Sequence, residues 1–265
     1  MKTFNSIKLA HKLPIFLVGF GVLMAVILVT FSTISFKNHT ISSSEESFKA
    51  LVAGREMALK NFLDSVDSDI ITIAAAPSTG TAVERLSMSW NGLSSKGDAG
   101  EALRQGYVTD NPNPLGQKHL LDRAEGNSSY HSLHEGVHPA FRTLMEAKGY
   151  YDVFLISLEG DIIYSVFKEA DYGTNLLTGL YKDSGLAKVF RAATDAKPGE
   201  VFFSDMEGYA PSNGDAAAFI STIVLDEIGE PIGVLAFQLP VALLTNITNN
   251  TEGLGESVEI YLVGP

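Results

Sequence analysis

Residues 134–138 read HEGVH and satisfy the pattern H-E-x-x-H. In that pattern two histidines on successive turns of a helix bind zinc, and the glutamate between them acts as a general base for hydrolysis. His134 and His138 are therefore candidate metal ligands, and Glu135 is a candidate base. Glu159 follows downstream as a candidate third ligand. On this hypothesis the chain is a zinc hydrolase.

Pro139 comes directly after the motif. A proline inside a helix cannot donate to the carbonyl four residues earlier, and its ring clashes with that carbonyl. The sequence therefore predicts a turn at HEGVH and a new helix over PAFRTLMEAK that stops at Gly149. The two histidines then lie on either side of a helix boundary, so we expect them to form structural hydrogen bonds and regard them as weak metal candidates.

Other catalytic machinery is missing from the sequence. There are no cysteines, which excludes disulfides, thiolate metal sites and cysteine nucleophiles. No phosphate-binding loop, paired-carboxylate motif or activated nucleophile stands out, so we expect no enzyme activity and no cofactor. The chain has 19 basic and 31 acidic residues, a net charge of −12. That balance argues against nucleic acid as a partner, because few phosphates could be neutralised.

The N-terminal residues are typical of a membrane anchor. Residues 1–12 contain three lysines and no acidic residue, and residues 13–36 contain no charge. An uncharged stretch of this length exceeds the roughly 20 residues that span a bilayer and the roughly 7–15 residues of a signal-peptide core. Flanking lysines favour a cytoplasmic N-terminus. We expect a cytoplasmic tail (1–12), a transmembrane helix (13–36) and a periplasmic remainder (37–265) in the bacterial inner membrane.

Residues 37–76 predict a long helix that leads away from the membrane. Apolar residues recur at steps of mostly three and four from Phe48 to Ile73. Ser42–Ser44, followed by two glutamates, predict a capped restart of the helix, and Pro77 ends it. The apolar seam either packs on its own domain or pairs with a second subunit, and a homodimer is expected.

The residues after position 76 are predicted to contain an α+β module. Residues 77–139 form a helical and loop region with short helices at ALRQGY and QKHLLDRA. From residue 140 to 250 come a hairpin (YYDVFLIS and DIIYSVF), a helix (GLYKDSGLAKVFRAAT), three strands (EVFFSDM, AAFISTIVLD and IGVLAFQL) and a closing helix. This order indicates a five-stranded antiparallel sheet with flanking helices.

Several of these segments resemble a known family. DVFLISLEGDIIYS, DYGTNL and STIVLDEIGEPIGVLAFQLP are similar to the PAS-like module of Cache domains, the extracytoplasmic sensors of bacterial receptors. The likeness covers about residues 100–265 and is nearest to the sensor region of methyl-accepting chemotaxis proteins and membrane-bound nucleotide cyclases. It implies a receptor that binds a small molecule and signals across the membrane. The output would be chemotaxis, with an adenylate or guanylate cyclase or a histidine kinase as the alternative.

The resemblance also implies further segments and limits the ligand. Residues 251–265, with VEIYLVG, would begin a second, truncated module, so the chain is expected to be part of a longer receptor. The Arg-Trp-Tyr motif of amino-acid-binding double Cache domains is missing, so an amino-acid ligand is not supported. An anchored zinc hydrolase and a purely structural dimerising scaffold remain as rival hypotheses.

A PAS-like sheet curves around its ligand, so polar contacts should come from the helix before the hairpin, the strands and the loop after the second strand. The candidate ligand-binding residues are Arg142, Tyr151, Tyr164, Lys168, Asp171, Tyr172, Asp205, Tyr209 and Gln238. Their mixture of cations and tyrosines suits a small anionic or hydroxylated metabolite, whose carboxylate would pair with Arg142.

Overall fold

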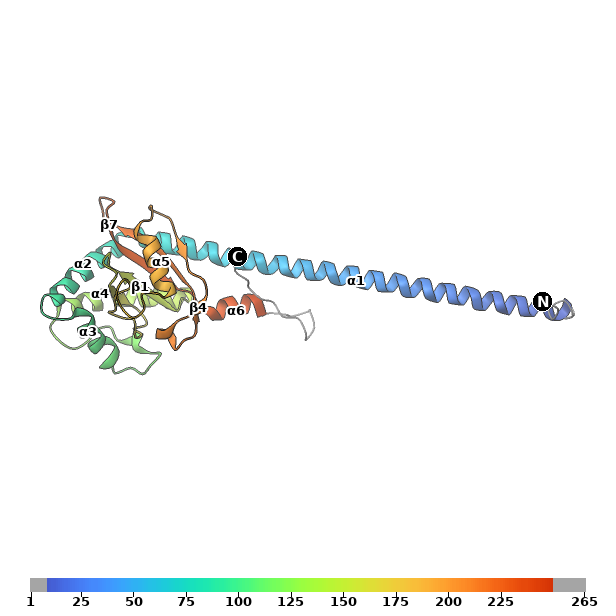
Figure 1. Cartoon of the computed structure of the whole chain (residues 1–265), viewed down its shortest axis with the longest axis horizontal. Coiled ribbons are helices and arrows are strands. Elements are labelled where there is room, and N and C mark those ends of the chain that lie inside the picture. Colours follow the sequence, from blue (N-terminus) through green and yellow to red (C-terminus); the bar gives the residue numbers. More distant parts are fainter. Residues whose placement is uncertain (1–8, 250–265) are drawn as a thin grey trace. The chain divides into compact units, whose positions relative to one another are not determined.

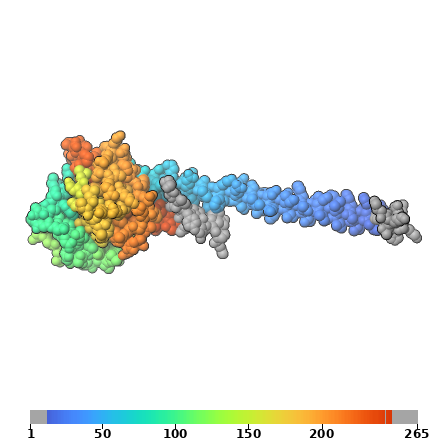
Figure 2. Space-filling model, viewed as in Figure 1, coloured from blue at the N-terminus to red at the C-terminus, as the bar shows by residue number. Residues whose placement is uncertain are grey.

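The computed structural model describes residues 9–249. The chain divides into two compact units, Met1–Met57 and Ala58–Pro265. The first unit contains the N-terminal part of helix α1 (Leu9–Ala74), whose side chains are open to solvent in the space-filling view (Figure 2). The second unit contains the sheet and all the other helices of the described residues.

Helix α1 is a single helix of 66 residues. By length and composition it can cross a membrane, and the large apolar residues between Leu13 and Phe36 are exposed. The predicted restart at Ser42–Ser44 is wrong, because the helix runs through these residues without a break. The Ser47 hydroxyl donates to the Ser43 carbonyl at 2.9 Å, which is how serine is accommodated inside a helix.

The five strands of the main sheet are all antiparallel and follow the order β2-β1-β7-β6-β3. They are β1 (Asp152–Ile156), β2 (Ile162–Ser165), β3 (Phe202–Phe203), β6 (Phe219–Leu225) and β7 (Pro231–Gln238). In the central pair Leu155 lies opposite Leu235 and Asp152 opposite Gln238. The predicted α+β class, the hairpin and the five-stranded antiparallel sheet are confirmed.

Each face of the sheet has its own core, because successive side chains of a strand point to opposite faces. Val153 and Leu155 belong to the core that includes Val66 and Ile70 of α1 together with α2 (Pro77–Ser94) and α4 (Ser129–Lys148). Phe154 belongs to the other core, which is covered by α5 (Gly185–Thr194). The second unit is thus a sheet between two helical layers (Figure 1).

The region between α1 and α4 is more helical than predicted. Pro77 follows the end of α1 as expected, but it also opens α2, a helix of 18 residues. The predicted helix at ALRQGY appears as α3 (Ala99–Arg104), which continues into a π-helical turn, η1 (Gln105–Thr109). The predicted helix at QKHLLDRA is limited to one 3₁₀ turn, η2 (Lys118–Leu120).

Helix α4 contains the whole HEGVH motif, with Pro139 inside it. The predicted helix boundary at this proline is therefore wrong, and the division expected at residues 139/140 falls within α4. Ser128 caps the N-terminus of α4 by accepting a hydrogen bond from the Tyr130 amide, and Gly149 ends the helix with a left-handed conformation. Pro139 lies on the exposed side, where water can satisfy the carbonyl that the proline leaves without an amide donor.

The remaining elements lie near one end of the sheet. A small two-stranded sheet forms from β4 (Glu207–Gly208) and β5 (Ala216–Ala217), with the turn η3 (Ala210–Ser212) between them. The predicted closing helix is present as α6 (Val241–Asn249). The predicted start of a second module at residues 251–265 lies outside the described residues.

Candidate functional site

The segment after β2, residues 166–172, supplies polar side chains to two separate places and is called the β2 loop here. Asp152, at the start of β1, holds this loop. Its Oδ1 accepts hydrogen bonds from the amides of Val166 and Phe167, each at 2.9 Å, and its Oδ2 accepts from the Ser165 hydroxyl at 2.6 Å. The loop bends sharply at Lys168, whose φ is 61°. As a result, neighbouring side chains leave the loop in different directions.

The first place is an open cleft of 520 Å³ where β1 begins, β7 ends and α6 starts. A cleft of this size is within the range of small-molecule sites. Its walls are largely apolar and aromatic. The lining residues are Met145, Gly149, Tyr150, Tyr151, Phe167, Ser212, Asp215, Ala216, Gln238, Leu239, Pro240, Val241 and Ala242.

The polar floor of this cleft is a chain of hydrogen bonds. The Gln238 amide nitrogen donates to the Ser212 hydroxyl at 3.2 Å, and Ser212 donates to Glu169 Oε2 at 2.6 Å. The Tyr151 hydroxyl donates to Glu169 Oε1 at 2.8 Å. Gln238 is only 3% exposed, and its amide oxygen has no hydrogen-bond partner. A buried acceptor without a donor is costly, so this oxygen is suited to a donor supplied by a ligand.

Three buried carboxyl groups lie together near the cleft. Besides Glu169 they are Asp152 and Asp171, both fully buried. Asp171 Oδ2 accepts from the Tyr209 hydroxyl at 2.5 Å, and its Oδ1 has no partner. Burial raises the pKa of Asp152 to about 8 and that of Asp171 to about 7, and it also raises the pKa of Glu169. We call Asp152, Glu169 and Asp171 the carboxyl cluster.

The second place lies between α4 and the β2 end of the sheet. Its side chains form what we call the histidine cluster. The members are Tyr107, His119, Tyr130, His131, His134, His138, Arg142, Tyr164, Lys168 and Tyr172. The rings of His134 and His138 stack with centroids 4.5 Å apart, and Tyr107 packs on His134 at 4.3 Å.

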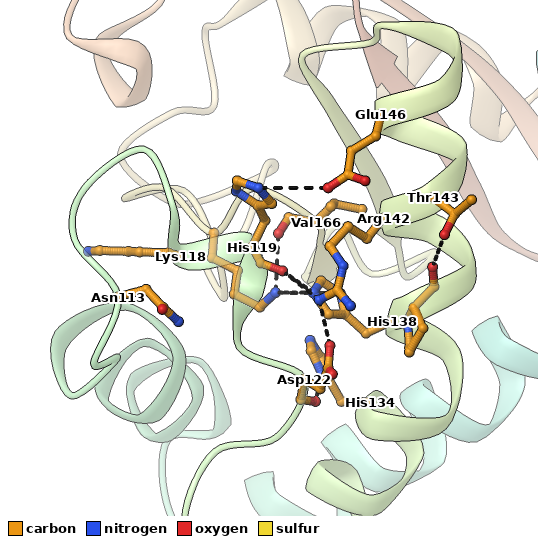
Figure 3. Close-up of polar contacts among 12 residues, drawn as sticks. Asn113, Lys118, His119, Asp122, His134, His138, Arg142, Thr143, Glu146 and Val166 are labelled. Carbon is orange, nitrogen blue, oxygen red and sulfur yellow. Dashed lines mark hydrogen bonds and ion pairs between the residues drawn. The ribbon is translucent and has the colours of Figure 1, made fainter.

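Helix α4 uses this cluster to hold the segment His119–Asp122. His134 Nδ1 donates to the Asp122 carbonyl at 2.6 Å, and His138 Nε2 donates to the His119 carbonyl at 2.7 Å. Arg142 donates to the same His119 carbonyl and to Asp122 Oδ1 at 2.6 Å. Figure 3 shows His138 and Arg142 directed from α4 toward this segment. His134, His138 and Arg142 are spaced by four residues and share one face of α4, so all three can bind the segment His119–Asp122.

Lys168 is fully buried within the histidine cluster. Its Nζ lies 3.0 Å from His138 Nε2 and 3.1 Å from the Val166 carbonyl. His138 Nε2 donates its N–H to the His119 carbonyl and cannot also accept a hydrogen bond from Lys168. The Val166 carbonyl is therefore the main acceptor for this amine. Burial lowers the pKa of Lys168 well below its usual value. Burial, followed by the charge of Lys168, lowers the pKa of His138 to about 3 and that of His134 well below its usual value.

In HEGVH the glutamate and the two histidines have different partners. Glu135 is exposed and binds Arg123 at 3.1 Å, whereas His134 and His138 are buried. In the part of the chain from residue 9 to 249, no group of three or more histidine, aspartate and glutamate side chains is arranged to hold a metal ion. Glu159 lies in the turn between β1 and β2, outside the histidine cluster. Neutral histidines that donate to loop carbonyls have a structural role.

The nine candidate ligand-binding residues fall into three groups. Tyr151 and Gln238 line the cleft, and Asp171 with Tyr209 belongs to its carboxyl surroundings. Arg142, Tyr164, Lys168 and Tyr172 belong to the histidine cluster. Asp205 is exposed and joins neither group.

Sequence reasoning missed several residues of both places. Glu169 and Ser212 are hydrogen-bonded in the cleft floor. No sequence pattern marks them, because they are far apart in the sequence and come into contact only when the chain folds. Tyr107 and Tyr130 lie within residues 77–139, for which the sequence predicted only a helical and loop region. Asp152 had a usable signal. It is an acidic residue at the start of a strand that is otherwise apolar, where a buried charge needs several donors.

No family model and no curated protein matches the chain. Solved structures similar to it include an extracellular ligand-binding receptor of Desulfohalobium retbaense, with 13% identity over 68% of this chain and 26% of that chain, and a TM-score of 0.32. The sensor domain of the histidine kinase DctB of V. cholerae has 14% identity over 64% of this chain and 58% of its own, with a TM-score of 0.35. The sensory domain of the Campylobacter jejuni chemoreceptor Tlp3 has 13% identity over 73% and 68%, with a TM-score of 0.35.

This chain thus spans about a quarter of the first of these receptors and little more than half of the second. The second is a histidine-kinase sensor domain and the third is the sensory domain of a chemoreceptor.

Proposed function

We propose that residues 37–265 are the extracytoplasmic ligand-sensing region of a bacterial transmembrane receptor, a methyl-accepting chemotaxis protein. Helix α1 anchors it in the inner membrane, with residues 1–12 in the cytoplasm. A cyclase or histidine-kinase receptor would use the same region for the same task. The region binds a small molecule and performs no reaction on it, and two copies pair along α1, where Phe48 and Val52 are exposed.

The observation that carries this proposal is the floor of the cleft. An amide oxygen of Gln238 without a partner, a buried Ser212 and a buried Glu169 meet beside an open volume of 520 Å³. Polar groups at the base of an apolar cleft orient and select a small ligand. The β2 loop joins this floor to the histidine cluster, so a ligand that displaces the loop would alter the packing of α4.

The test is the stability of the chain, reconstituted in lipid nanodiscs, against a panel of metabolites. A ligand at 100 times its dissociation constant raises the free energy of unfolding by about 2.7 kcal/mol. Gln238→Leu and Ser212→Ala should remove most of this increase. Glu159→Gln, at an exposed position in the β1–β2 turn, is the control and should leave the increase unchanged. If Gln238→Leu and Ser212→Ala respond like the unmodified chain, the ligand does not bind in the cleft.

A further inference from the structure

The cleft is lined without any basic side chain. Of its lining residues within the described chain, Asp215 is the one that carries a charge, and Glu169 lies directly behind Tyr151 and Ser212. Lys168 adjoins Glu169 in sequence, but its amine points into the histidine cluster. Lys148, near the rim, is paired with Asp69 at 2.8 Å. The charge that faces the cleft is therefore negative.

The carboxyl cluster forms no ion pair in the part of the chain that is described, although the charge of Asp152 acts on the pKa of Lys168. Asp152, Glu169 and Asp171 form no ion pair with a lysine, arginine or histidine there, and their hydrogen-bond donors are hydroxyl groups and backbone amides. Buried carboxylates are ordinarily paired with a cation. Gln238 Oε1, in the cleft, lacks any donor, and so does Asp171 Oδ1 in the carboxyl cluster. The site thus has an excess of acceptors. Because burial favours the protonated forms of Asp152 and Asp171, the negative charge that acts on the cleft comes from Glu169 and Asp215.

The walls of the cleft complement a cation that carries an apolar body. Tyr150, Tyr151 and Phe167 present aromatic rings, and the rings of Tyr151 and Phe167 lie 4.8 Å apart. Aromatic faces attract cations, and more strongly when the cation is withdrawn from water. Met145, Leu239 and Val241 add apolar surface. Such walls would contribute little to the binding of a bare metal ion, and no described group of three carboxylate or histidine side chains could coordinate one.

We infer that the ligand of this cleft is a small organic cation, a protonated amine on an apolar or aromatic body. This inference rests on the proposed sensing function and specifies its ligand class. The ammonium group donates to Gln238 Oε1 and lies near Glu169, and the body packs on Phe167 and Tyr150. A carboxylate ligand would meet Glu169 and Asp215 with like charge. The cleft therefore opposes the anionic ligand that the sequence suggested.

The experiment compares three probes of similar size that differ in charge: phenethylamine, phenethyl alcohol and 3-phenylpropanoate. Their affinities for the chain in nanodiscs are measured by isothermal titration calorimetry at pH 7. Phenethylamine should bind at least tenfold more tightly than the alcohol, and the carboxylate should bind most weakly. Added salt should weaken the binding of the amine and leave that of the alcohol nearly unchanged.

Variants assign the effect to the cleft. Glu169→Gln should lower the affinity for phenethylamine at least tenfold and change the affinity for the alcohol little. Asp215→Asn, at an exposed position, should lower the amine affinity by a smaller factor, roughly twofold to threefold. Glu159→Gln should change neither affinity.

The outcomes separate the ligand class from the function. If the carboxylate or the alcohol binds as tightly as the amine, or if Glu169→Gln and Asp215→Asn leave the amine affinity unchanged, the ligand class is wrong. The proposed function still stands in that case if Gln238→Leu removes the stabilisation by a metabolite from the panel. If phenethylamine shows no binding at all, the inference is overturned, whatever the panel shows.

Discussion

Lys168 combines two unfavourable features at one residue. Its backbone has a positive φ, which few residues other than glycine adopt, and its amine is buried without a carboxylate partner within ion-pair distance. A buried amine that is held in an ion pair would cost about 3–5 kcal/mol when removed. The amine of Lys168 makes its main hydrogen bond to one carbonyl, so its removal should cost much less.

We therefore expect Lys168→Met to leave the free energy of unfolding within about 1 kcal/mol of the original value, or to raise it. The stem of methionine fills most of the same space and carries no charge. Urea denaturation followed by the fluorescence of the single tryptophan, Trp90, measures this, because Trp90 is buried in the same core. A loss of 3 kcal/mol or more would show that Lys168 is paired by a charge that this structure does not reveal.

At the residue scale, the sequence did not predict the direction in which each polar side chain points. The pattern of the β2 loop identified Lys168, Asp171 and Tyr172 as polar residues beside a ligand, yet the loop sends Lys168 and Tyr172 to the histidine cluster and Asp171 to the carboxyl cluster. Which way each side chain points depends on the bend at Lys168. That bend depends on Asp152 more than ten residues away, and local patterns do not record such contacts.

At the scale of elements, glycines show where backbone must approach backbone. A Cβ atom at Gly100 of α3 would lie 2.1 Å from the Gly173 carbonyl oxygen, which also accepts from Arg104 at 2.7 Å. A Cβ at Gly136, on the exposed side of α4, would meet nothing within 4 Å. Backbone atoms therefore crowd Gly100, whereas Gly136 lies in open space, and the sequence alone does not reveal this difference.

The same substitution should have opposite effects at these glycines. Gly136→Ala should raise the free energy of unfolding by about 0.5–1 kcal/mol, because alanine is the better helix former. Gly100→Ala should lower it by about 2 kcal/mol or more, because α3 must move away from Gly173. Urea denaturation of both variants under one set of conditions provides the comparison. Equal effects would show that α3 is not held against Gly173.

The elements themselves were predictable where periodicity was strong. Alternation and β-branched residues located the strands of the hairpin and the β6–β7 pair, and these strands are present. The proline rule failed at α4 because helix packing outweighs one lost backbone hydrogen bond on the exposed side. Helix α2 was missed because serine, threonine and glycine fill much of its sequence, although its buried residues Ala82, Val83, Leu86 and Trp90 follow helical spacing.

At the scale of the whole molecule, the carboxyl cluster links stability to pH. Burial raises the pKa of Asp171 from 3.8 to about 7, so the folded protein keeps a proton that the unfolded chain has released. This contribution to stability is complete below pH 3.8 and is lost as the pH rises through about 7. In Asp171→Asn the contribution is missing at every pH.

The difference in unfolding free energy between the unmodified chain and Asp171→Asn should therefore fall as the pH rises from about 4 to 8, by an amount of the order of 3 kcal/mol. The histidines and Lys168 also change the unfolding free energy with pH, in the opposite direction. Their contribution is the same in both proteins and cancels in the difference. Denaturation at pH 4.5, 6 and 8 measures it. Asp205→Asn, at an exposed position, is the control. A difference that rises with pH would show that Asp171 is ionised in the folded state and stabilised by donors.

The β2 loop has a consequence for how this protein can diversify. Its seven residues serve the floor of the cleft and the histidine cluster at once, so a change in the loop that retunes one place disturbs the other. Because one substitution in the loop affects both places, ligand specificity should not change during evolution through substitutions in this loop. Asp215, Val241 and Ala242 line the cleft and lie outside the β2 loop, so they are not under this constraint. We expect homologues that respond to different compounds to vary at those positions and to keep the loop.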